Sequence, residues 1–216
     1  MSGLIRKNMS IQKTFVSFTT CCALVTLCSC ADVGDKFSIP STDTLTIGQM
    51  TPDQAVALFG KPSTKTEDVY PEGSYEVYKY TFAHADISAI NGRVMLLEFK
   101  DGKLNGYLYW SSFDADKTRI SLQNVDALKA GFGKLTKDDV VKLMGKPDAK
   151  TICPSVMADF RERCYQNTEA WGWYMTDDVN LWLLGPQKIK SAELYVTFDD
   201  RGKVSGVELT GENQPD

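Results

Sequence analysis

The side chains that could support catalysis are sparse in this sequence. Its only histidine, His84, lies in the run YTFAHAD at the end of an expected strand. A nucleophilic hydroxyl or thiol needs a base within hydrogen-bond reach, and a lone histidine without such a partner is usually structural or exposed. The sequence holds no G-x-S-x-G, H-E-x-x-H or P-loop motif, each of which marks a known chemistry. We therefore expect that the protein is not an enzyme.

Metal and cofactor sites have equally little support. The adjacent carboxylates at 177–178 and 199–200 point to opposite faces if they lie in strands, and a calcium loop needs more oxygen ligands at closer spacing. Cys153 and Cys164 would need further zinc ligands, and His84 is the one histidine in the chain. We expect no metal and no cofactor.

The charge of the chain argues against a nucleic-acid partner. The full sequence carries 24 basic and 28 acidic residues, a net charge of −4. Three of the basic residues, and none of the acidic ones, lie in residues 1–29, so the remainder holds 21 basic against 28 acidic residues. A basic patch, the usual electrostatic footprint of a nucleic-acid-binding protein, is not expected here.

The first 30 residues have the pattern of a secretory signal. Residues 14–27 are uncharged and follow Lys13, but the run is shorter than the roughly 20 residues that cross a bilayer as a helix. It ends in Leu27-Cys28-Ser29-Cys30, which resembles the lipobox of bacterial lipoproteins. The resemblance implies cleavage after Ser29 and acylation of Cys30, which would anchor the protein to a membrane. Ala31 resembles the residue that sorts such proteins to the outer membrane; an uncleaved anchor, or a plain secretory signal with chance cysteines, remains an alternative.

Export also suggests a role for the other two cysteines. After cleavage, Cys153 and Cys164 are the cysteines left besides Cys30. An even pair in an oxidising compartment is typical of a disulfide. We expect a bond that closes this short loop.

One pattern occurs twice, 85 residues apart, in residues 48–62 and 133–147. Thr51 and Thr136 suit the N-cap of a helix, and Gln54 completes a capping box with Thr51. Gly60 and Gly145 suit the residue after the helix. Each copy therefore predicts a helix of about two turns, which must pack on something else to be stable. The residues that recur in register are Gly48/Gly133, Thr51/Thr136, Asp53/Asp138, Val56/Val141, Leu58/Leu143, Gly60/Gly145, Lys61/Lys146 and Pro62/Pro147.

Apolar runs after each copy predict strands. Asp101-Gly102-Lys103 and Asp200-Arg201-Gly202 are hairpin signals. A further helix is expected at 125–130, with a weaker counterpart near 42–47. The expected fold class is α+β, with two tandem α-α-β-β-β(-β) modules whose helices pack on one face of antiparallel sheets. The expected strands are 75–82, 94–100, 104–110, 169–176, 180–184, 192–199 and 203–209. The expected organisation is a lipoprotein signal peptide at 1–29, a tether at 30–43, a first repeat at 44–110, a connection at 111–124 and a second repeat at 125–210.

The repeated helix motif and the following Phe-x-Asp-Gly-Lys, together with the lipobox, resemble the BamE/SmpA/OmlA family of outer-membrane lipoproteins. The same module occurs in tandem in the β-lactamase inhibitory proteins. The resemblance implies an envelope protein that binds or scaffolds other proteins, in outer-membrane assembly or integrity. The alternative that it implies is an inhibitor of a periplasmic hydrolase of the β-lactamase or lysozyme type.

The aromatic residues are the candidate contacts to an envelope protein. Tyr and Trp are enriched at binding hot spots. They are also common in the cores of small sheets, and the sequence leaves both interpretations open. The candidates are Tyr107, Tyr109, Trp110, Trp171, Trp173 and Trp182.

Overall fold

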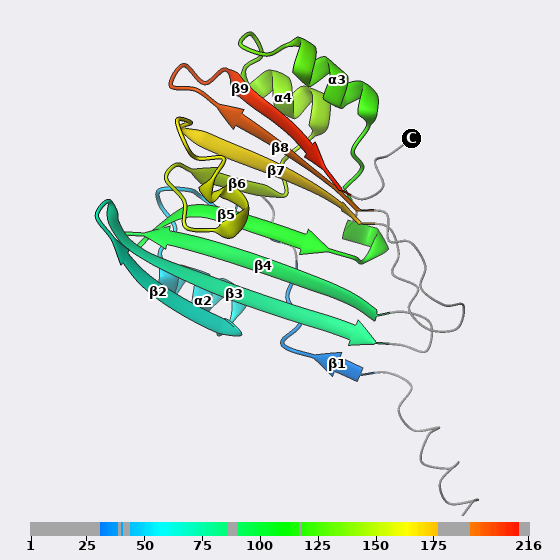
Figure 1. Cartoon of the computed structure of the whole chain (residues 1–216). Helices are drawn as coiled ribbons and strands as arrows, with labels where there is room; N and C mark the ends of the chain where they lie inside the picture. The colour runs from blue at the N-terminus through cyan, green and yellow to red at the C-terminus, as the bar shows by residue number, and fades with distance from the viewer. Residues whose placement is uncertain are drawn as a thin grey trace, which may run out of the picture.

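The computed structural model describes residues 31–38, 40, 44–85, 90–116, 118–176 and 191–211. Nine strands in this part of the chain form one antiparallel sheet in the order β1-β3-β4-β5-β6-β7-β8-β9, with β2 also paired to β3 (Figure 1). The strands are β1 (Ala31–Val33), β2 (Thr64–Tyr70), β3 (Gly73–Ala85), β4 (Ile90–Lys100), β5 (Lys103–Ser111), β6 (Ala149–Ile152), β7 (Glu169–Thr176), β8 (Ser191–Phe198) and β9 (Val204–Thr210).

The helices are few and short. The longest, α3, has nine residues and lies with α4 beyond the β9 edge (Figure 1). Among the described residues, none of the helices is long and apolar enough to span a membrane. The helical elements are α2 (Pro52–Phe59), the 3-10 turn η1 (Asp114–Asp116), α3 (Leu122–Ala130), α4 (Lys137–Met144) and α5 (Ala158–Arg161).

The expected fold class of two tandem helix-on-sheet modules is wrong. Strand β5 pairs with β6 through Gly106–Leu108 and Ala149–Thr151, so both halves of the chain share one continuous sheet. That sheet, and not the helices, makes up most of the molecule. The joining strand β6 has four residues, too few to give a periodic signal in the sequence. Of the segment near 42–47, for which a helix was expected, the described residues 44–47 are not helical and lie in turns and a bend.

The two capped helices are present where the repeat predicts them. The hydroxyl oxygen of Thr51 accepts a hydrogen bond from the Gln54 amide at 3.3 Å, and the Gln54 side chain accepts one from the Thr51 amide at 2.9 Å. Thr136 and Asp139 form the same capping box at the start of α4. Gly60 and Gly145, which end the helices, have φ of 81° and 79°, a conformation that other residues rarely adopt.

The hairpins β4–β5 and β8–β9 are also present, and each carries a β-bulge. In the first turn, Asp101 and Gly102 have φ of 50° and 74°, as a tight two-residue turn requires. The strand expected at 180–184 lies outside the described residues.

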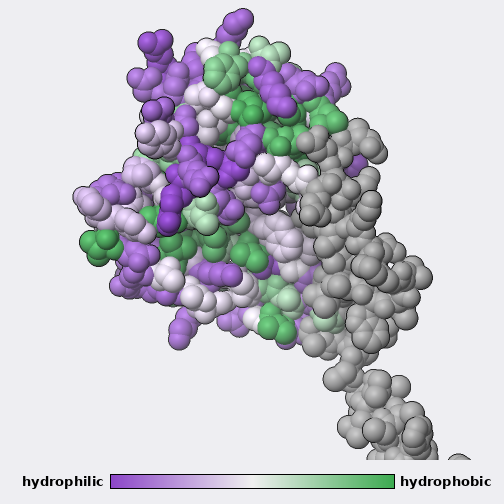
Figure 2. All heavy atoms as spheres, in the orientation of Figure 1, coloured by the Kyte–Doolittle hydropathy of each residue, from purple (hydrophilic) through white to green (hydrophobic). Residues whose placement is uncertain are grey.

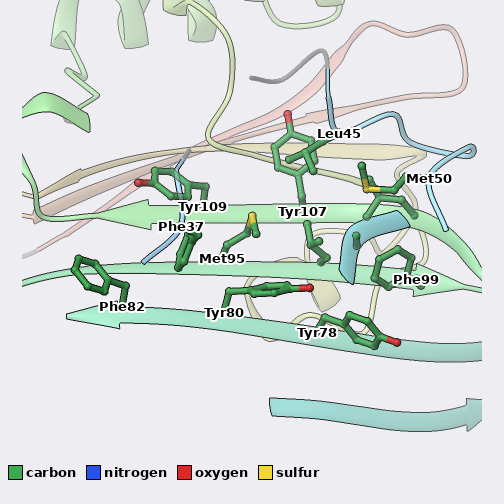
Figure 3. Packing of buried hydrophobic residues seen from close by; sticks show 13 residues of the cluster. Phe37, Leu45, Met50, Tyr78, Tyr80, Phe82, Met95, Phe99, Tyr107 and Tyr109 are labelled. Carbon is green, nitrogen blue, oxygen red and sulfur yellow. The ribbon is translucent and has the colours of Figure 1, made fainter. Parts of the chain in front are cut away.

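Two core clusters lie on the side of the sheet that carries α2, α3 and α4. In the first, Ala55 of α2 clusters with buried side chains of β3, β4 and β5. Figure 3 shows Tyr80, Met95 and Tyr107 of these strands. In the second, α3 and α4 contribute Leu128 and Val140 to the β7–β9 part of the sheet. The buried members of the first cluster are Phe37, Leu45, Met50, Ala55, Tyr78, Tyr80, Phe82, Met95, Leu97, Phe99, Leu104, Tyr107 and Tyr109.

The opposite side of the sheet carries a third, smaller cluster and a loop closed by a disulfide. The predicted Cys153–Cys164 bond is present, and it should stabilise the fold by about 3 kcal/mol. The fully buried carboxylate of Glu98 accepts hydrogen bonds from the Ser155 hydroxyl and the Val156 amide, both at 2.8 Å. On this side of the molecule, hydrophobic residues lie in separate patches among hydrophilic ones (Figure 2).

The first strand lies in segment 30–43, for which we expected a tether. Residues 31–33 of β1 pair with Ala83–Ala85 of β3. The Asp32 carboxylate lies 2.6 Å from Nδ1 of His84, so the only histidine of the chain has a structural partner in this pairing.

Candidate functional site

A groove lies where the two halves of the sheet meet, on the side that carries the helices. It has a volume of about 460 Å³ and is open to solvent. Its walls come from the loop before α2, from β5, β6 and β7, and from α4 with the turn after it. We call it the midline groove; it is lined by Leu45, Thr46, Ile47, Tyr107, Val141, Lys146, Pro147, Lys150 and Trp171.

Three lining residues stand in a row across the sheet. Lys150 of β6 is the register partner of Tyr107 in β5 and of Trp171 in β7. Directly opposed residues of antiparallel strands project to the same face, with Cβ atoms about 5 Å apart. The floor of the groove is therefore a cation between two aromatic rings, and the Lys150 ammonium lies 5.2 Å from the Trp171 ring centroid.

A buried carboxylate holds this row in place. Glu169, 4 % exposed, accepts a hydrogen bond from Trp171 Nε1 at 2.6 Å and pairs with Lys150 at 3.0 Å. Its second oxygen binds the ammonium of Lys137 in α4. Burial would raise the pKa of the Glu169 carboxyl, but the bonds from Lys137, Trp171 and Lys150 outweigh burial and hold the pKa below its usual value. The Glu169 carboxylate thus forms ion pairs with two ammonium groups, those of Lys137 and Lys150.

The Tyr107 hydroxyl is a neutral donor at neutral pH. Burial, followed by the negative charges of Asp148 and Glu169, raises its pKa well above the usual value. The ring stands off β5 beside Leu45, and its hydroxyl points away from Met95 (Figure 3). It can therefore donate a hydrogen bond to an acceptor in the groove.

The polar groups that line the groove can donate hydrogen bonds to a ligand. They are the ammonium groups of Lys146 and Lys150 and the hydroxyls of Tyr107 and Thr46. In the part of the chain that the structure describes, no group of three or more His, Cys, Asp or Glu side chains is placed to hold a metal ion.

A second hollow, of about 420 Å³, lies on the other side of the sheet beside β8 and β9. Its main cation, Arg163, is already engaged. The guanidinium donates to both carboxylate oxygens of Glu208 at 2.9 Å and lies 3.6 Å from the Tyr195 ring centroid. This hollow therefore offers less to a charged ligand than the midline groove.

The structure divides the six aromatic candidates. Tyr107 and Trp171 line the midline groove on either side of Lys150, and both are largely buried, with 5 % and 4 % of their surface exposed. Tyr109 and Trp173 are buried in the helix-side cores, where the Tyr109 hydroxyl donates to Asp116 at 2.9 Å. Trp110 packs against the cluster on the opposite side of the sheet. Trp182 lies outside the described residues, as does the lipidation candidate Cys30.

Sequence reasoning missed most of the groove. Lys146 belongs to the repeated Gly-Lys-Pro, which we interpreted only as a helix end. Lys150 lies in β6, a strand that was not expected. The apolar wall at 45–47 lies where a helix was expected to be. The four residues of β6 give no periodic signal of their own, so no pattern in the sequence would have placed Lys150 in the groove.

Comparison with known proteins adds a distant likeness. No protein-family model matches the chain, and no curated protein matches it in sequence. The resemblance to the BamE/SmpA/OmlA lipoproteins is therefore not supported. A crystal structure from Streptococcus mutans, with the name "putative beta-lactamase inhibitor protein", is similar at a TM-score of 0.44 and 12 % identity, over 78 % of this chain and 91 % of that one. A likeness this distant concerns the arrangement of the chain and carries no argument about function.

Proposed function

We propose that the chain is an exported lipoprotein, anchored to a membrane through Cys30, that binds an envelope protein in the midline groove and catalyses no reaction. The observation that carries the proposal is the row of Tyr107, Lys150 and Trp171 on the groove floor. Tyr and Trp in a partly desolvated pocket are typical of binding hot spots.

The shape of the groove favours a protein segment over a small molecule. It is open to solvent, and five separate segments of the chain contribute to its walls. Small-molecule sites enclose most of the ligand surface, whereas an open groove with a central aromatic anchor suits an extended or helical peptide segment.

The ion pairs of Glu169 with Lys137 and Lys150 fix side chains of the groove before a partner binds. Glu169 ties α4 to β7 through Lys137 and fixes Lys150 at the same time. A partner would therefore meet side chains whose positions are already set, which lowers the entropic cost of binding.

The proposed lipid anchor at Cys30 is argued from the signal sequence, and it fits the position of the first strand. Ala31, the residue after Cys30, is already paired in β1. A lipid on Cys30 would therefore hold the β1–β3 edge of the sheet within about one residue of the membrane surface, since a residue spans at most about 3.6 Å.

Site-specific photo-cross-linking in intact cells tests the binding site. A photoreactive amino acid replaces Val141, which lines the groove, and in a matched variant it replaces Lys79, whose side chain lies on the opposite face of β3. We expect a protein adduct from position 141 and none of the same mass from position 79. The absence of any adduct at 141, with the variant folded and exported, would reject the groove as the binding site.

A second candidate is inhibition of a periplasmic hydrolase. The observation that favours it is the loop closed by Cys153–Cys164 and fixed by Glu98, because a rigid loop loses little entropy on entering an active site. Titration of the full-length protein in detergent against β-lactamases and lysozyme-type enzymes tests it. No loss of enzyme activity at micromolar inhibitor would remove this candidate.

A further inference from the structure

We infer that the exposed side of α2 is a second docking surface, which binds an amphipathic helix of another protein in the position that α3 occupies against α4. We call this surface the α2 face; it consists of Val56, Ala57 and Leu58 and the hollow beside them. The inference stands apart from the midline groove, because the two hollows have only Thr46 in common among their lining residues.

Three consecutive apolar residues of α2 are exposed to solvent. Val56, Ala57 and Leu58 are all exposed, Val56 with 38 % and Leu58 with 55 % of its surface. A run of exposed apolar residues is unfavourable in a folded protein unless it is used for binding. Beside it lies an open hollow of about 450 Å³, between α2 and the turns at residues 44–50, and none of the residues that line this hollow is charged.

The second half of the chain shows what covers the equivalent face of α4. Val141 and Leu143 are the repeat equivalents of Val56 and Leu58, and both are partly buried rather than exposed. Helix α3 lies beside α4 and contacts it (Figure 1). In the first half, the described residues 44–49 that precede α2 are not helical. Among the described residues, therefore, no helix lies against α2 as α3 lies against α4.

A hydrogen bond strengthens this comparison. Pro62 and Pro147 follow the two helices and have no amide hydrogen to donate to the carbonyls four residues earlier, those of Leu58 and Leu143. In the second half, the Asn124 side chain of α3 donates to the Leu143 carbonyl at 2.8 Å. In the part of the chain that the structure describes, no equivalent donor reaches the Leu58 carbonyl. A helix in the α3 position could supply this donor from an Asn or Gln side chain.

The α2 face suits a helix of another protein better than a second copy or a lipid surface. In this chain α3, which covers α4, is already packed on α4 and β9. A helix that binds a membrane surface usually carries Lys or Arg beside its apolar face, whereas α2 carries Asp53 and no basic residue.

The way α3 packs also indicates the chemistry of the partner helix. Val125 and Leu128 of α3 are buried in the cluster that α4 joins, and Asn124 stands next to them. Apolar residues three or four positions apart are the usual anchors of a helix that binds in a groove. We therefore expect a partner helix with apolar side chains at this spacing and an Asn or Gln beside them.

Photo-cross-linking from position 57 in intact cells tests the inference. A photoreactive amino acid replaces Ala57 in the full-length protein, and in a matched variant it replaces Lys142, the exposed repeat equivalent on α4. We expect an adduct with another protein from position 57 and none of the same mass from position 142. Mass spectrometry should locate the cross-link in a segment with apolar residues three or four positions apart next to an Asn or Gln.

Substitutions at two equally exposed apolar residues locate the binding. Leu58→Lys should reduce the yield of the adduct from position 57 at least about tenfold. Phe132, which is 57 % exposed, lies in the turn after α3, and Phe132→Lys should change the yield less than about twofold. Because both side chains are more than half exposed, both variants should fold, and urea unfolding checks this. A yield that persists in Leu58→Lys would overturn the inference.

The remaining outcomes decide the nature of the partner. A synthetic peptide of the cross-linked segment should gain helix, measured by circular dichroism, when it binds the full-length protein in detergent. An adduct with the mass of two copies, a cross-linked segment without the apolar spacing, or no protein adduct from a folded variant would each overturn the inference. The result from position 141 tests the midline groove separately, so either proposal can fail while the other stands.

Discussion

The ammonium of Lys150 lies 3.0 Å from the carboxylate of Glu169, across the β6–β7 ladder and two residue pairs away from direct register. This contact lies where the sheet passes from the first half of the chain to the second. It links the groove floor to α4, because Glu169 also binds Lys137. The binding surface and the join between the two halves therefore depend on one buried carboxylate.

Replacing Glu169 with Gln should destabilise the protein strongly. The change leaves the Lys137 and Lys150 ammonium groups, both about one-third exposed, without their counter-charge. Breaking a fully buried pair costs about 3–5 kcal/mol, and partial exposure of the lysines reduces the expected loss to about 2–3 kcal/mol. Urea unfolding monitored by circular dichroism measures it. Glu67→Gln, which breaks an exposed pair with Lys65, is the control and should change stability little.

The stability should depend on the ionisation of Asp148. Its carboxylate accepts hydrogen bonds from the Thr118 hydroxyl at 2.8 Å and the Tyr174 amide at 3.0 Å. Burial raises the pKa of this carboxyl from 3.8 to about 6 despite these two bonds. The folded state therefore binds the proton more tightly than the unfolded state does. The resulting stabilisation is complete below about pH 4 and is lost as pH rises through about 6.

Asp148→Asn removes this titration. A shift of about two units corresponds to about 3 kcal/mol, so wild type should lose up to that amount between pH 4.5 and 7.5. The pH-dependent loss of stability in Asp148→Asn should be smaller than that of wild type by about 3 kcal/mol. Urea unfolding at both pH values gives the comparison, and identical pH dependence in the two proteins would refute the role of Asp148. Glu169, whose pKa is lowered from 4.5, contributes in the opposite direction, because its stabilisation is lost as pH falls below that usual value.

The join between β5 and β6 depends on a glycine. A Cβ on Gly106 would lie 2.5 Å from Oγ1 and 2.7 Å from Cβ of Thr151, which is itself fully buried. Gly106→Ala should therefore cost about 1–3 kcal/mol, as overpacking does. Gly92→Ala, whose Cβ would meet its nearest neighbour at 3.5 Å, should cost less.

The double variant Gly106→Ala with Thr151→Gly shows whether the clash is the cause. It should be more stable than the sum of the two single changes predicts, by about 1 kcal/mol, because the second change removes the atoms in conflict. Strict additivity in thermal unfolding would show that the two residues do not touch, and would place β5 and β6 in another register.

Features that depend on interactions between residues close in the sequence could be predicted, and features that depend on pairing between distant strands could not. The caps at Thr51 and Thr136 and the Asp101-Gly102 turn were predicted because their hydrogen bonds and dihedral angles are local. Strand β2 was missed because six of its seven residues are exposed and give no apolar alternation. Strand β6 was missed because it is short, and its pairing to both halves decides the fold class.

The candidate site was predictable to the same limited degree. Tyr107 and Trp171 were among the aromatic candidates, but exposure decides between core and contact, and exposure depends on pairing across the sheet. Trp171 and Trp173 lie on the same face of β7 and are 4 % and 0 % exposed. Only Trp171 lines the groove, and no pattern within β7 separates the two.

Lipidation at Cys30 should be detectable directly. Cells grown with an alkyne-labelled palmitate should incorporate the label into the wild-type protein, since acylation supplies the membrane anchor. Cys30→Ser should abolish incorporation, and Cys28→Ser, at the neighbouring cysteine, should retain it. Label that persists in Cys30→Ser would reject the assignment of the anchor to this residue.

The groove itself is tested most directly by filling it. Thr46, which lines the groove, is replaced by Trp, and the yield of the adduct photo-cross-linked from position 141 is measured in intact cells. Lys79→Trp adds the same ring on the opposite face. The account predicts that the adduct falls at least about tenfold in Thr46→Trp and is unchanged in Lys79→Trp. An equal yield in both variants would contradict it.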